Sequence, residues 1–165
     1  MPALAAGKTA PEFTLTTTDG RHFSVGENLR KGPVLAVFFK ISCPVCQFAL
    51  PYIERLYRAY RDKNVAVVGI SQNDASSTAA FLKQYGITFP IVLDDARKYE
   101  VSNAYGLTNV PTVFLIASDG KIVVSSVGWS RKDIEEINAQ LAEAARAQQA
   151  LLFQTGEEVP GWKPG

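Results

Sequence analysis

An uninterrupted run of apolar residues from Val34 to Phe39 is the feature that most restricts how this chain can fold. A run of this length without polar alternation is typical of a strand buried on both faces. Such a strand takes a central place in a sheet that helices cover on both sides. The chain has 165 residues and is 47% hydrophobic, so we expect one α/β domain over residues 1–150, followed by a C-terminal tail over 151–165.

The segments after this run alternate between helix and strand patterns. Apolar residues recur at intervals of three and four from Pro44 to about Asp62, which predicts a helix with one buried face and a kink at Pro51. Further elements are expected as a strand at 65–71, a helix at 76–85, a strand at 90–93 and a helix at 97–105. This alternation predicts a parallel core.

Two turns predict antiparallel hairpins. Asp19-Gly20 separates short strands at 11–15 and 21–25, and residues 118–121 separate strands at 112–116 and 122–127. His22 lies beside the first turn, and we interpret it as a solvated surface histidine.

The C-terminal part should begin as a helix and then lose regular structure. Ser130 is a plausible N-cap for a final helix that runs to about Ala150. Residues 154–165 contain several Pro and Gly and are expected to be irregular, docked by Trp162 or by residues 151–153.

The chain has only two cysteines, Cys43 and Cys46, and both follow the buried strand at the start of the predicted helix. Open α/β sheets generally place their sites at this carboxyl end of a strand. Two cysteines are too few for a secreted disulfide framework, and with the single distant His22 they make a poor zinc site. We interpret the pair as redox-active, the alternative being two inert buried thiols. No metal or cofactor is expected.

The two thiols should differ in their roles. Cys43 lies at the helix N-terminus, where unpaired N–H groups and the positive end of the helix dipole stabilise a thiolate, so it is expected to attack. Cys46 lies one turn further along and should be more buried, so it is expected to resolve the mixed disulfide. Pro44 and Val45, between them, are expected to contact the substrate.

A second informative segment, Val110-Pro111, precedes the strand at 112–116. A proline at a strand start could be trans and merely tolerated there. The functional interpretation is a cis bond whose turn brings the backbone of Val110 beside Cys43, where it could pair with an incoming peptide.

The balance of charged residues and the N-terminal sequence restrict the kinds of partner that the protein can bind. The chain has 17 basic and 16 acidic residues, which gives no electrostatic signal for nucleic acid or an acidic membrane surface. Its start lacks the pattern of an export signal, and no run reaches the ~18 apolar residues of a membrane span. We therefore expect a monomer that is cytoplasmic as written, or periplasmic or extracytoplasmic if a signal or anchor has been removed.

Taken together, these segments resemble the thioredoxin-like superfamily, specifically thiol-disulfide oxidoreductases of the TlpA/ResA type, and more loosely the AhpC/TSA redoxin group. The resemblance covers roughly residues 8 to 148 and rests on four segments: Ala10-Pro11-Glu12-Phe13, Cys43-Pro44-Val45-Cys46 with Pro51, Tyr85 to Pro90, and Val110-Pro111-Thr112. It implies a central mixed sheet flanked by helices, with an N-terminal hairpin, a mid-fold strand and helix insertion, and a cis-proline facing the cysteines. Together, the cysteine pair and Val110-Pro111 favour a dithiol–disulfide oxidoreductase that reduces disulfides in a client protein with electrons from a donor protein, the alternative being oxidation of client dithiols.

The chain departs from this pattern at three positions around the cysteines. Ser42 stands where relatives usually have Trp, Val37 where thioredoxins commonly have a buried Asp, and Ala49 where ResA-like proteins have Glu. Both familiar proton acceptors for Cys46 are therefore absent. Water, Lys40 or Asp74 could assist instead.

Two other functions stay open. A peroxiredoxin-like thiol peroxidase needs, by the pattern of that family, a hydroxyl three residues before the reactive cysteine and a proline further upstream. Lys40 and Ala36 occupy those places, so the match is poor. The third possibility is a non-catalytic, redox-linked binding or metal-carrier module.

Overall fold

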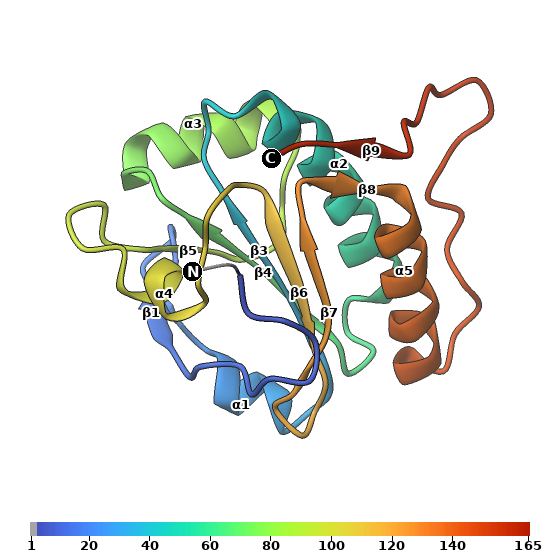
Figure 1. The fold of residues 1–165 in the computed structure, drawn as a ribbon, viewed down its shortest axis with the longest axis horizontal. Coiled ribbons are helices and arrows are strands. Elements are labelled where there is room, and N and C mark those ends of the chain that lie inside the picture. The colour runs from blue at the N-terminus through green and yellow to red at the C-terminus, as the bar shows by residue number, and fades with distance from the viewer. Residues whose placement is uncertain (1–2) are drawn as a thin grey trace.

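A five-stranded mixed sheet forms the centre of the protein in a computed structural model that describes residues 3–165 (Figure 1). Its strand order is β5-β4-β3-β6-β7. The parallel strands are β3 (Val34–Phe39), β4 (Ala66–Ser71) and β5 (Ile91–Leu93), and the antiparallel ones are β6 (Thr112–Ile116) and β7 (Ile122–Val127). Every residue of β3 is buried, which confirms the central strand predicted from the apolar run.

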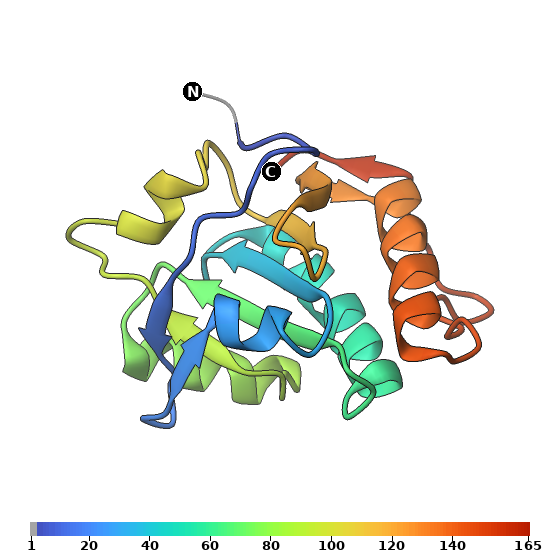
Figure 2. The same cartoon turned by 90° about the horizontal axis from the view of Figure 1, so that it is seen from below.

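Helices cover both faces of this sheet. One face carries α2 (Pro44–Tyr60), α3 (Ala75–Tyr85) and α5 (Arg131–Ala145), and the other carries α1 (Val25–Leu29) and α4 (Glu100–Ala104). Figures 1 and 2 show the two groups on opposite sides of the strands. The central mixed sheet with helices on both faces confirms the predicted α/β fold, and the mid-fold insertion stays a prediction.

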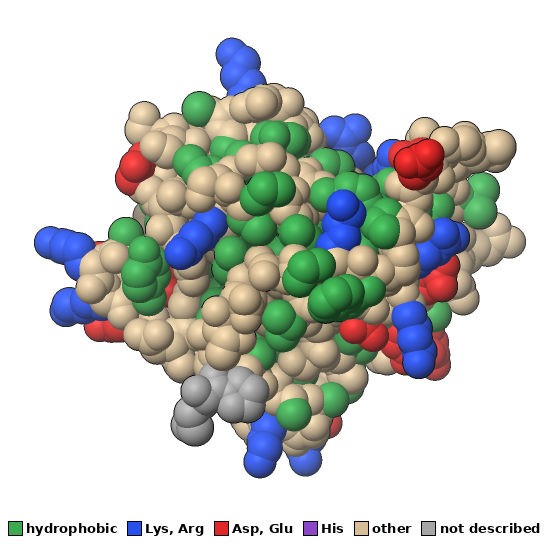
Figure 3. Space-filling view, turned by 45° about the horizontal axis from the view of Figure 1, so that its top comes forward, with side chains coloured by type: hydrophobic (Ala, Val, Ile, Leu, Met, Phe, Trp, Pro, Cys, Tyr) green, Lys and Arg blue, Asp and Glu red, His purple; other side chains and the backbone are tan. Residues whose placement is uncertain are grey.

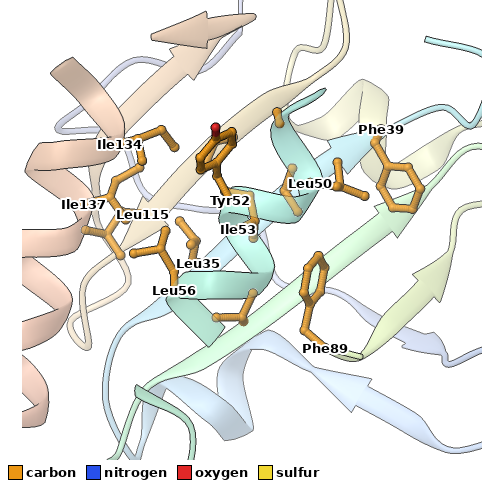
Figure 4. Packing of buried hydrophobic residues seen from close by; sticks show 14 of the residues in the cluster. Leu35, Phe39, Leu50, Tyr52, Ile53, Leu56, Phe89, Leu115, Ile134 and Ile137 are labelled. Carbon is orange, nitrogen blue, oxygen red and sulfur yellow. The ribbon is translucent and has the colours of Figure 1, made fainter. Parts of the chain in front are cut away.

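The packing of α2 fixes where the cysteines lie. Leu50, Ile53 and Leu56 on this helix have no exposed surface. They pack against sheet residues such as Leu35 and against Ile137 of α5, as Figure 4 shows. Because this face is filled on both sides, α2 cannot shift along β3 without opening a cavity. The helix runs without interruption through Pro51, and the kink predicted there stays a prediction.

Two short two-stranded sheets lie beside the central sheet, and two of the strand pairs are the predicted hairpins. Strands β1 (Thr14–Thr16) and β2 (His22–Ser24) form the predicted N-terminal hairpin, and β6 and β7 form the second. His22 is exposed, as predicted for a surface histidine. Strand β8 (Trp129–Ser130) pairs with β9 (Trp162–Lys163).

Two helices are shorter than predicted because single residues adopt left-handed backbone. Tyr99 has φ 49°, so α4 begins only at Glu100, and residues 95–98 form a turn in which Asp95 accepts from the N–H of Arg97. Arg146 has φ 53° and ends α5 at Ala145, five residues before the predicted Ala150. Neither residue is glycine, so residue type does not mark these two helix boundaries.

The tail is more ordered than the sequence predicted. The expectation of irregular structure over 154–165 is wrong at β9, which pairs with β8. The guanidinium of Arg55 donates to both carboxylate oxygens of Glu157, at 2.7 and 2.8 Å, and also to the carbonyl of Leu152. Leu152 is buried and Phe153 packs against the core, whereas the side chains of Leu151 and Trp162 are 95% and 64% exposed. The side chains of Leu152 and Phe153 therefore dock the tail.

No helix within residues 3–165 is both long enough and apolar enough to cross a membrane.

A buried tyrosine joins α2 to α5 and to the start of the tail. The hydroxyl of Tyr60 donates to Oδ1 of Asn138 and accepts from the N–H of Ala150 at 2.8 Å. Tyr60→Phe leaves both partners without this hydrogen bond, so we expect a loss of about 1–3 kcal/mol in the free energy of unfolding. Urea unfolding of the reduced protein measures the change.

The matched control is Tyr57→Phe on the same helix. Tyr57 packs edge-on against Phe89, and within residues 3–165 its hydroxyl makes no hydrogen bond. We expect this variant to lose less than about 0.5 kcal/mol. Equal losses in the two variants would contradict the role assigned to the Tyr60 hydroxyl.

Candidate active site

Cys43 is the N-cap residue of α2. Its backbone is extended, and its Sγ accepts a hydrogen bond from the N–H of Cys46 at 3.1 Å. The sulfur therefore takes the place that a serine or aspartate oxygen usually fills at a helix start. Pro44 occupies the first turn, where its missing N–H costs nothing. This geometry holds a half-buried sulfur at the positive end of the helix.

The loop between β3 and Cys43 is braced from two sides. The N–H of Ile41 donates to Oδ1 of Asn73, which follows β4, and the carbonyl of Ile41 accepts from Nε2 of Gln47 on α2, both at 2.9 Å. Sequence reasoning missed Asn73 and Gln47. These two amides hold the loop in one conformation, so the position of Cys43 is set by both β4 and α2.

The Val110-Pro111 segment lies directly beside Cys43. Its peptide bond is cis, as predicted. The thiol of Cys43 donates to the carbonyl oxygen of Val110 at 3.4 Å, across 67 residues of sequence. The loop is held by Thr112, whose hydroxyl donates to the carbonyl of Asn109 at 2.8 Å. The structure thus brings the two segments singled out in the sequence into contact.

Cys46 lies in the core one turn further along the helix. Its side chain has no exposed surface and belongs to the same apolar cluster as Leu50 and Ile53. Burial, and secondly its hydrogen bond with Cys43, raise the pKa of the Cys46 thiol far above its ordinary value. This thiol is therefore protonated at neutral pH and is shielded from solvent.

The acids near the site are engaged elsewhere. Among residues 3–165, the buried carboxylates are Glu54 and Asp94. Glu54 accepts from the N–H groups of Thr88 and Phe89, and Asp94 accepts from Ser102. Neither is hydrogen-bonded to Cys46.

The positions where relatives keep an acid are apolar and buried here. Val37 has no exposed surface, and Ala49 has 2%. Of the other proton acceptors suggested by the sequence, Asp74 caps α3 by accepting from the N–H of Ser77 at 2.7 Å, and this bond lowers its pKa. Lys40 is exposed at the end of β3. The structure therefore offers no carboxylate partner for Cys46 in its described part.

A groove of about 520 Å³ opens on the side of Cys43 that faces α4. Gln72 and Ser102 line it as part of a polar network, in which Nε2 of Gln72 donates to Oγ of Ser102 at 2.9 Å and Ser102 donates to Asp94 at 2.7 Å. The other lining residues are Lys40, Cys43, Pro44, Tyr99, Asn103, Leu107, Thr108, Asn109, Val110 and Gly165. In Figure 3, which turns this end of the molecule forward, hydrophobic and some basic side chains occupy the middle of the face and acidic ones its margins.

Only two of the four residues predicted to contact the substrate line this groove. Pro44 and Val110 line it, whereas Pro111 is buried and Val45 packs against the core. Gln72 could have been found, since it directly follows a parallel strand at its carboxyl end. Ser102 and Gly165 carry no such signal in the sequence. Within residues 3–165, no cluster of three or more Cys, His, Asp or Glu side chains could hold a metal ion.

Comparisons with known proteins agree with this geometry. The Redoxin family model matches residues 5–141. The thiol-disulfide oxidoreductase ResA of Geobacillus thermodenitrificans is 34% identical over 136 residues, 81% of this chain and 76% of the relative. The ResA of Bacillus thuringiensis is 32% identical over 128 residues, 77% of this chain and 72% of the relative.

A solved structure supports the same assignment. The thiol:disulfide interchange protein of the thioredoxin family from Chlorobium tepidum superposes with a TM-score of 0.70 at 25% identity, covering 87% of this chain and 99% of the other. The fold, the cysteine pair and these relatives agree. The chain therefore belongs to the Redoxin family, as a thioredoxin-like thiol-disulfide oxidoreductase of the TlpA/ResA type.

Proposed function

We propose that the protein reduces disulfides in client proteins, with Cys43 as the attacking thiol and Cys46 as the resolving thiol. One observation carries the assignment of roles: the sulfur of Cys43 is half-buried at a helix start beside the groove, whereas that of Cys46 is fully buried behind it. An incoming disulfide can approach only the first of these sulfurs.

In the first step, the thiolate of Cys43 attacks one sulfur of the client disulfide. A bond forms between Cys43 and the client, the client S–S bond breaks, and the second client sulfur leaves as a thiolate. The N–H of Cys46 donates to the Cys43 sulfur at 3.1 Å and holds it at the helix start beside the groove.

In the second step, Cys46 attacks the sulfur of Cys43 and forms the intramolecular disulfide. The bond between Cys43 and the client breaks, and the client leaves reduced. Because the Cys46 thiol is protonated and has no carboxylate partner among the described residues, we propose that its proton passes to the departing client sulfur. The step is then balanced without an acid or base from the protein. A dithiol donor protein would return the Cys43–Cys46 disulfide to its reduced state.

The backbone of Val110 is the proposed docking edge for the client. Its carbonyl already contacts the thiol of Cys43, and within the described residues its N–H makes no hydrogen bond. An extended peptide can therefore pair with this edge while its disulfide lies over Cys43. Pro44 contributes an exposed apolar surface beside the thiol.

The peroxidase alternative gains no support at its two diagnostic positions, which hold exposed Lys40 and buried Ala36. The monomeric state and the cytoplasmic location stay predictions.

Cysteine variants test the assigned roles. We expect Cys43→Ser to abolish reduction of a peptide disulfide, because no other accessible thiol is present. Cys46→Ser should still attack but should stop at the mixed disulfide. Mass spectrometry of the protein after one exposure to the peptide should then show a covalent adduct with Cys46→Ser and none with Cys43→Ser. Adducts formed through Cys46 in the Cys43→Ser protein would reverse the assignment.

The buried thiol should also make the stability of the reduced protein depend on alkaline pH. Burial raises the pKa of Cys46 in the folded state, so its contribution is fully present below the unfolded pKa of about 8.5 and is lost as the pH rises above it. We expect this thiol alone to lower the free energy of unfolding by up to about 1.4 kcal/mol per pH unit.

Urea titrations of the reduced wild type and of Cys46→Ser at a series of alkaline pH values measure this effect. The free energy of unfolding should fall more steeply with rising pH in the wild type than in Cys46→Ser, since a serine hydroxyl does not titrate in this range. Parallel curves would show that Cys46 ionises as readily in the folded protein as in the unfolded chain.

A further inference from the structure

The last residues of the chain, 162–165, are held against the side of the active site. Strand β9 pairs with β8, and the N–H of Arg131 donates to the carbonyl of Gly161 at 2.9 Å. The ammonium of Lys163 lies 5.1 Å from the ring centre of Phe48 on α2. Together with the Arg55–Glu157 ion pair upstream, these contacts fix the segment in place. We call residues 162–165 the wall segment.

Beyond β9, the wall segment reaches the loop that contacts Cys43. Gly165 lines the same groove as Cys43, and its carbonyl accepts from Nδ2 of Asn109 at 3.3 Å. Figure 1 shows the end of the chain beside the loop that leads into β6.

The wall segment packs so closely against neighbouring backbone that glycine is needed at two positions, Gly165 in the segment and Gly128 opposite Lys163. A Cβ atom on Gly165 would lie 2.9 Å from the carbonyl oxygen of Val110 and 3.2 Å from the Cβ of Asn109. A Cβ atom on Gly128, which has φ 78°, would lie 2.3 Å from the carbonyl oxygen of Lys163. Distances under 3 Å to backbone atoms cannot be relieved by a side-chain rotation. Two glycines thus let the backbone of the wall segment lie against the docking edge at Val110.

We propose that the wall segment forms one side of the client groove, and that Gly165 is a specificity-determining position for an extended peptide disulfide. The inference rests on the proposed function, since it assigns a binding role beside the same thiol. The opposite side is formed by Gln72 and Ser102, which buried Asp94 holds in place. An extended peptide that pairs with Val110 fits between these two sides, whereas a broad folded surface meets the wall segment first.

The substitution Gly165→Ala tests this proposal with a one-carbon change. Its Cβ would collide with the Val110 carbonyl, so the wall segment must move away from the docking edge. Gly161→Ala is the matched control, because a Cβ at Gly161 meets nothing within 4 Å. Each protein is assayed with a linear peptide disulfide and with the small aromatic disulfide 2,2′-dithiodipyridine, and dithiothreitol serves as the reductant for turnover.

The measured quantity is the ratio of kcat/KM for the peptide to the rate constant for the small disulfide, which needs no groove. We expect Gly165→Ala to lower this ratio about fivefold, mainly through KM. Gly161→Ala should keep the wild-type ratio. Lys163→Met, which removes the contact with Phe48, should lower the ratio in the same direction and gives a second way to loosen the segment.

Three results would overturn the proposal: an unchanged ratio in Gly165→Ala, equal ratios in Gly165→Ala and Gly161→Ala, or a higher ratio. A higher ratio would mean that the segment covers the docking edge instead of forming a side of it. These results are distinct from failure of the proposed function, in which the wild type itself would reduce neither disulfide.

Discussion

The packing of α2 on the buried strand β3 is the constraint on which the rest of the site depends. Because Leu50, Ile53 and Leu56 fill the space between the sheet and α5, the first turn of α2 has one position relative to the end of β3. That position puts the Cys43 sulfur at the helix N-terminus and Cys46 inside the core. The difference between an accessible thiol and a buried one is therefore a consequence of helix packing, and it needs no special residue near either sulfur.

The same packing explains the chemistry that the site lacks. Val37 and Ala49 face a filled apolar core, and a carboxylate at either place would be buried without a partner, which costs several kcal/mol. Of the two buried acids, Glu54 accepts from N–H groups in the loop before β5, and Asp94 accepts from N–H groups in the first turn of α4. Both buried acids therefore hold neighbouring backbone in place, and neither is hydrogen-bonded to Cys46.

The sequence predicted the elements that local pattern determines. The apolar run became β3 with the same bounds, the three-and-four spacing became α2, and Val110-Pro111 is cis beside Cys43. The misses have two causes. The helix boundaries at Tyr99 and Arg146 come from single non-glycine residues with left-handed backbone, which the residue pattern does not mark. The pairing of β9 with β8 joins segments far apart in the chain, for which residue pattern carries little signal. The polar network of Gln72, Ser102 and Asp94 was missed for the same reason.

Contacts between distant segments also build the groove beside the two thiols. The pair and its helix start are local, so any chain with this spacing could form them. The groove is assembled from the ends of β3 and β4, from α4, from the loop before β6 and from the wall segment. Residues that arrive from distant segments therefore decide what reaches Cys43, while the local segment decides what Cys43 can do.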